Sequence, residues 1–128
     1  MNVRMLKIAA LSFVIAPVFA HTAAHAADAQ LQAMAGMVLT INHYPDDAQK
    51  GALQKIVNDA NATPANRALA GALLHMQHAV ADADKQKLKA IMDDKAAPEQ
   101  AKQLAGILTH FQHTASAEDK EKLKAIAK

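Results

Sequence analysis

The chain has 128 residues and no cysteine, which excludes disulfides, thiolate nucleophiles and covalent haem attachment. Fourteen Lys and Arg stand against twelve Asp and Glu, and two of the basic residues, Arg4 and Lys7, lie at the N-terminus, so the remainder of the chain is neutral. Beyond residue 26 only Tyr44 and Phe111 are aromatic. These features exclude the basic, stacking surface typical of nucleic-acid binding and leave enough residues for one small domain.

The N-terminal residues resemble a secretory signal peptide. Arg4 and Lys7 precede an apolar stretch from Ile8 to about Ala16, and small residues follow it. Pro17 interrupts this stretch, which is too short to span a bilayer. We therefore expect no membrane anchor after cleavage and a periplasmic or secreted location.

Two positions fit the requirement for small residues at a cleavage site, after Ala20 and after Ala26. We favour Ala26, so we expect cleavage to remove residues 1–26 and to leave 27–128 as one helical domain. Cleavage after Ala20 would instead leave His21 at the N-terminus, where an imidazole and an α-amine together favour copper.

The remaining sequence resembles itself at a spacing of 35 residues. The tetrapeptide Leu-Lys-Ala-Ile occurs at 88–91 and again at 123–126. Self-similarity of this period is typical of helical repeat arrays. We predict three repeats, at about 29–61, 63–95 and 97–128, each with a longer helix that carries Gly and His, a short break and a shorter lysine-rich helix.

The longer helices are predicted from apolar residues at i, i+3, i+4 and i+7, which form one buried face. The predicted face consists of Met34, Met37, Val38 and Ile41, then Leu69, Ala72, Leu73 and Met76, then Leu104, Ile107, Leu108 and Phe111.

The helix starts are predicted from capping residues. Thr63 precedes Pro64 as a cap, and the shorter helices are expected to begin near Asp47, Asp82 and Ser116. The predicted fold is all-α, with three helix-turn-helix repeats of 35 residues that form a short solenoid or a closed helical bundle.

Histidine is the residue type that the repeat singles out. Every histidine beyond the favoured cleavage site follows a helical glycine by seven residues, or lies three residues before such a histidine. The pairs are Gly36 with His43, Gly71 with His78 and Gly106 with His113, and the additional histidines are His75 and His110.

The two His-x-x-His pairs predict a transition-metal site. Residues three apart on a helix have Cβ atoms about 5–6 Å from each other, and neighbouring helices pack at about 8–10 Å. His75 and His78 could therefore face His110 and His113 and offer four nitrogens to Zn²⁺, Cu²⁺ or Ni²⁺. His43 would be auxiliary, because Thr40 replaces its partner.

The glycines Gly36, Gly71 and Gly106 lie on the same predicted helix face as the histidines. Glycine inside a helix costs about 1 kcal/mol relative to alanine. Its presence in all three repeats predicts a close approach to the backbone there, either by a neighbouring helix or by a ligand.

Enzyme chemistry is not expected. The chain has no His-Glu-x-x-His, no phosphate loop and no nucleophile beside a base, so neither a peptidase nor a nucleotide site is predicted. The few aromatic residues also argue against a haem pocket.

Two hypotheses for the function stay open. The first is a metal-binding buffer, carrier or stress-protection protein, and the second is a metal-free interaction module that binds a protein partner with its Gly/His face. The metal and the oligomeric state stay open too.

Overall fold

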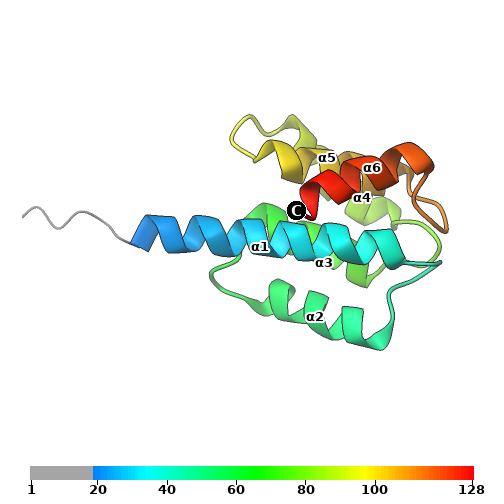
Figure 1. Ribbon diagram of the computed structural model, residues 1–128, viewed down its shortest axis with the longest axis horizontal. Coiled ribbons are helices and arrows are strands. Elements are labelled where there is room, and N and C mark those ends of the chain that lie inside the picture. The colour runs from blue at the N-terminus through cyan, green and yellow to red at the C-terminus, as the bar shows by residue number, and fades with distance from the viewer. Residues whose placement is uncertain (1–18) are drawn as a thin grey trace, which may run out of the picture.

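The computed structural model describes residues 19–128, and all regular structure in this part is helical (Figure 1). The predicted all-α class is confirmed. The predicted signal segment up to residue 18 lies outside the described residues, and the favoured cleavage site after Ala26 lies within the first helix. The helices are α1 (Phe19–Thr40), α2 (Asp47–Asn58), α3 (Pro64–Leu74), α4 (Asp82–Asp93), α5 (Glu99–His110) and α6 (Ala117–Ile126).

Side-chain caps lie at the starts of α2, α3 and α6, as the sequence predicts for Thr63 and Ser116, whereas α4 and α5 have no side-chain cap. The Thr63 hydroxyl accepts the backbone N–H of Asn66 at 3.1 Å, with Pro64 in the first turn of α3. The Ser116 hydroxyl accepts the N–H of Asp119 in the same way at the start of α6. Helix α2 begins with a reciprocal capping box between Asp46 and Gln49 that the sequence analysis did not identify.

The six helices pack so that the last returns to the first. Helices α1, α3 and α5 contact one another at the centre. Helix α2 packs mainly on α3, α4 on α5, and α6 on α1. Figure 1 shows α6 beside α1, with the three loops that join α1 to α2, α3 to α4 and α5 to α6 at the end of the molecule opposite the start of α1. Among the described helices, none is both long and apolar enough to cross a membrane.

The core lies between the central helices and the apolar sides of the outer ones. The predicted apolar faces are buried, except that Met37 is only half-buried. Leu53, Leu88 and Leu123, which occupy equivalent positions on the outer helices, are completely buried. Packing against the central helices therefore explains why the short, lysine-rich helices form at all.

The helices that carry the glycines end earlier than the sequence suggests. Helix α3 ends at Leu74 and α5 at His110, so His78 and His113 lie in loops. The prediction that each His-x-x-His pair shares one helical face is wrong. The chain leaves the helical conformation before it reaches these histidines, at Phe111 with ψ 128° in the case of α5. The histidines themselves have φ angles of 63°, in the left-handed region, so they do not share a helical face with His75 and His110.

Candidate metal centre

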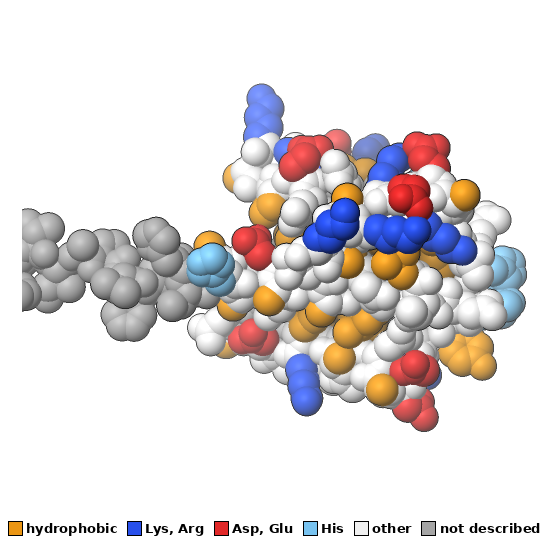
Figure 2. Space-filling model, in the orientation of Figure 1, with side chains coloured by type: hydrophobic (Ala, Val, Ile, Leu, Met, Phe, Trp, Pro, Cys, Tyr) orange, Lys and Arg blue, Asp and Glu red, His pale blue; other side chains and the backbone are white. Residues whose placement is uncertain are grey.

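Three loops meet at one end of the molecule, and each contributes one histidine at its centre. We call these loops the first (41–46), second (75–81) and third (111–116) loops, and their central residues His43, His78 and His113 the histidine cluster. The three residues are spaced 35 apart in the sequence. Figure 2 shows histidine side chains gathered at this end of the molecule.

A cycle of backbone hydrogen bonds joins the three residues. The N–H of His43 donates to the carbonyl of His113, that of His113 to His78, and that of His78 to His43, each at 2.7 Å. Each histidine thus satisfies one backbone donor and one acceptor in a loop, where helix partners are lacking. The cycle holds the three loops in register without using any side chain.

Each histidine also adopts a left-handed backbone conformation. The φ angles are 76° at His43 and 63° at His78 and His113, and these are the positive-φ residues of the described chain. Within the second loop the N–H of Ala79 donates to the carbonyl of Gln77 at 2.7 Å, and the third loop has the matching bond from Thr114 to Gln112. Such three-residue turns with positive φ are rare and strained. Left-handed residues other than glycine cluster at functional sites.

The imidazoles of the histidine cluster lie against one another. Their centroids are separated by 5.0 Å between His43 and His78, 4.9 Å between His43 and His113, and 5.2 Å between His78 and His113. One ring nitrogen from each lies within 4.8 Å of the other two. His43 is half-buried, whereas His78 and His113 are exposed. The arrangement therefore brings three imidazole nitrogens, which bind metal ions when the ring is neutral, close together at a point that is open to solvent.

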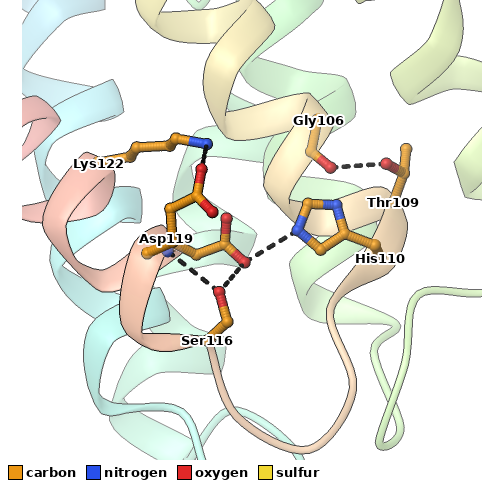
Figure 3. A network of polar contacts seen from close by, with 7 residues as sticks. Gly106, Thr109, His110, Ser116, Asp119 and Lys122 are labelled. Carbon is orange, nitrogen blue, oxygen red and sulfur yellow. Dashed lines mark hydrogen bonds and ion pairs between the residues drawn. The ribbon is translucent and has the colours of Figure 1, made fainter.

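His75 and His110 take part in a different interaction. A ring nitrogen of His75 lies 3.1 Å from Asp84, and one of His110 lies 2.9 Å from Asp119. Figure 3 shows the imidazole of His110 at the end of α5 directed at the carboxylate of Asp119 on α6, which also accepts the hydroxyl of Ser116 at 2.7 Å. Each pair therefore ties the end of a central helix to the start of the next helix across a loop.

Both carboxylates are more acidic than an ordinary aspartate. Burial raises the pKa of Asp84, but hydrogen bonds from Lys87 and His75 outweigh it, so the net pKa is lowered. For Asp119, burial again raises the pKa, and hydrogen bonds from Ser116 and His110 lower it further than burial raises it. Both side chains are thus held in the charged form that their partners require.

In the first loop, two uncharged side chains replace the histidine and the aspartate. Thr40 and Gln49 stand 35 residues before His75 and Asp84, and the Gln49 side-chain amide donates to the Thr40 hydroxyl at 2.8 Å. The contact joins the same two places in the fold. His75 and His110 are therefore exchangeable for a non-ligating residue, whereas the histidine-cluster position is histidine in all three loops.

The structure groups the predicted ligands differently from the sequence. It brings His78 and His113 together, as predicted, but joins them with His43, which the sequence made auxiliary. His75 and His110 instead contact the aspartates. The sequence analysis did not identify Asp84 and Asp119 as partners of these histidines. The signal that identifies them is the 35-residue spacing of Asp84 and Asp119 combined with that of His75 and His110.

The glycines show no tight helix contact. A Cβ atom added to Gly36 or Gly71 would meet no atom within 4 Å, and one on Gly106 would meet the sulfur of Met92 at an ordinary 3.6 Å. A neighbouring helix therefore does not require glycine at these positions. The space beside Gly36 and Gly71 is open.

Comparison with protein-family models, with curated proteins and with solved structures finds no match for this chain.

Proposed function

We propose that the protein binds one transition-metal ion through His43, His78 and His113. The observation that supports this is the convergence of three loops, each with histidine at a left-handed position, on one point. Glycine fits such a position at less cost than histidine, and a packing role would not demand the same imidazole three times. A single bound ion would explain why all three positions are histidine.

The spacing of the nitrogens favours an ion that accepts imidazole. Nitrogens bound to tetrahedral Zn²⁺ at about 2.0–2.1 Å lie roughly 3.4 Å apart. The ring nitrogens of the cluster lie within 4.8 Å of one another, so side-chain rotation needs to bring them closer together by at most about 1.4 Å. Three imidazoles also suit Cu²⁺ and Ni²⁺.

We further propose that the fold is three 35-residue helix-turn-helix repeats closed into a bundle rather than stacked as a solenoid. The contact of α6 with α1 and the cyclic order of the hydrogen bonds among the three histidines support closure. A solenoid would leave its first and last units apart. Closure is what would bring three equivalent loops to a single ion.

The proposed setting is outside the cytoplasm, with the ion as cargo. Residues 1–26 resemble a signal peptide, and Ala27, the first residue of the proposed mature chain, accepts the side-chain amide of Asn66 on its carbonyl at 2.9 Å. We propose a metal buffer, carrier or stress-protection protein without catalytic function. Intact-mass measurement of the exported protein should give a chain that starts at Ala27, and a full-length cytosolic protein would contradict export.

Equilibrium dialysis of residues 27–128 against Zn²⁺, Cu²⁺ and Ni²⁺, followed by elemental analysis, tests metal binding. We expect one ion per chain for at least one of these metals.

Metal binding should also stabilise the fold. An ion that binds only the folded state adds about 2.7 kcal/mol to the free energy of unfolding at a free concentration 100 times its dissociation constant, so the melting temperature should rise by about 10 °C. Binding should weaken below about pH 6.5, where free imidazole takes up a proton. Unchanged melting curves at pH 7.5 with all three ions would contradict the proposal.

A second candidate is a metal-free interaction module. The open space beside Gly36 and Gly71 favours it, because a partner helix or peptide could approach the backbone there. Substitution of both glycines by Ala should abolish partner binding under this hypothesis and leave metal binding intact under the first.

A further inference from the structure

We propose that the metal-loaded site binds a small dicarboxylate anion, with one carboxylate on the ion and the other in a groove beside His78. This inference rests on the proposed metal function and specifies the ligand that completes the site. It comes from a cavity of about 630 Å³ whose lining includes Tyr44, Lys50, His75 and His78. That volume lies within the range of small-molecule sites.

An ion held by three imidazoles has at least one free coordination position. Four-coordinate Zn²⁺ keeps one position for water or another ligand, and ions with higher coordination numbers keep more. His78 and His113 are exposed, so the free position faces solvent rather than the core. Because His78 is both a cluster residue and part of the groove wall, a molecule in the groove lies next to the ion.

The charges of the groove favour an anion. Lys50 contributes a positive charge, and none of the residues that line the groove is a carboxylate. The Asp84 carboxylate, which contacts the wall residue His75, is buried and also pairs with Lys87. A divalent ion on neutral imidazoles adds positive charge at the other end. Lys50 does pair with Asp47 at 3.9 Å, but Asp47 is fully exposed and such a pair is weak and screened. A ligand with two separated negative charges matches both positive ends.

The groove lies between the first and second loops, and Tyr44 on the first loop and Lys50 on α2 form one wall. Tyr44 is 58% exposed, and its ring lies beside the Lys50 ammonium, which is 5.7 Å from the ring centroid. The residues 35 and 70 positions further on are Ala79 and Thr114, which lack this wall. The lysine itself recurs as Lys85 and Lys120. Lys120 therefore provides a matched control on α6, outside the groove.

The test uses residues 27–128 saturated with Co²⁺, whose visible absorption reports changes in its ligands. Succinate, with two carboxylates, and acetate, with one, are titrated separately at pH 7.5. We expect both to shift the cobalt bands, and succinate to bind about tenfold more tightly than acetate. Lys50→Gln should remove the advantage of succinate, whereas Lys120→Gln should retain it.

The outcomes separate the two proposals. If cobalt binds but neither anion shifts its bands, or if acetate and succinate bind equally, the dicarboxylate site is overturned and the metal site stands. If Lys120→Gln reduces succinate binding as much as Lys50→Gln, general charge explains the effect and the groove is again overturned. If cobalt gives no spectrum of a bound ion, both proposals fail together.

Discussion

The first loop and the two later loops connect the end of one helix to the start of the next through different side chains. In the second and third loops a histidine at the helix end contacts a buried aspartate, as with His75 and Asp84. In the first loop a neutral hydrogen bond from Gln49 to Thr40 makes the same connection. All three loops nevertheless place a histidine at the centre in the left-handed conformation.

This comparison separates two roles that the sequence combines in His-x-x-His. The leading histidine acts together with its aspartate as a tie between helices, and another polar pair can replace it. The trailing histidine belongs to the cluster and is present in every loop. The unit to test is therefore one histidine from each of three loops, not two histidines from each of two helices.

The largest expected effect is on metal affinity. Replacing His43 by Ala removes one of the three proposed ligands, and we expect the dissociation constant to rise by about 100-fold, equivalent to about 2.7 kcal/mol. The matched change His75→Ala should alter it less than about threefold, because His75 contacts Asp84 rather than the cluster. Isothermal titration with the ion that binds best measures both. A larger loss of metal affinity for His75→Ala than for His43→Ala would instead support the ligand pairs that the sequence predicts.

The next effect concerns the helix ties. Asp84→Asn removes the charge that Lys87 and His75 contact, and we expect a loss of about 1 kcal/mol in the free energy of unfolding, since both partners are largely exposed. Because the folded-state pKa of Asp84 lies below its unfolded value, the carboxylate stabilises the fold above about pH 4 and ceases to do so as the pH falls through the lowered pKa.

Urea unfolding of both proteins between pH 7 and pH 3 measures this difference, which should shrink toward the acidic end. Thr40→Val, the matched change in the first loop, should cost less than about 0.5 kcal/mol and show no dependence on pH in this range. A pH-independent loss for Asp84→Asn would mean that the charge of the carboxylate is not what stabilises the tie.

An effect of similar size tests the backbone of the cluster. At φ 63°, His78→Gly should be more stable than His78→Ala by about 1 kcal/mol, because the left-handed conformation penalises a Cβ atom. The adjacent Gln77 has a negative φ, so there Gly should be less stable than Ala. Thermal unfolding of the four variants without metal gives the comparison. The same sign at both positions would contradict the left-handed turn.

The sequence predicts the helices well because their signals are local. The cap at Thr63, the proline at Pro64 and the apolar spacing along each helix all act within a few residues, and the structure has helices at these places. It predicts the loops poorly. Nothing near His78 shows that its backbone turns left-handed or that its N–H reaches a carbonyl 35 residues away.

The sequence predicts that histidines form the candidate site, but it does not predict which histidines come together. The 35-residue spacing makes His43, His78 and His113 equivalent, but helical spacing predicts instead that histidines three residues apart share a site. The hydrogen-bonded cycle depends on how three distant loops meet, which depends in turn on the packing of α6 against α1. The pairing of His110 with Asp119 spans a loop in the same way and follows no spacing rule within a helix.

The most direct measurement of the central claim is anomalous scattering at the zinc edge from crystals of zinc-loaded protein. The account predicts one strong peak per chain, about 2.0–2.1 Å from one nitrogen each of His43, His78 and His113. A peak beside His75 or His110, or no ordered peak at saturating zinc, would contradict it.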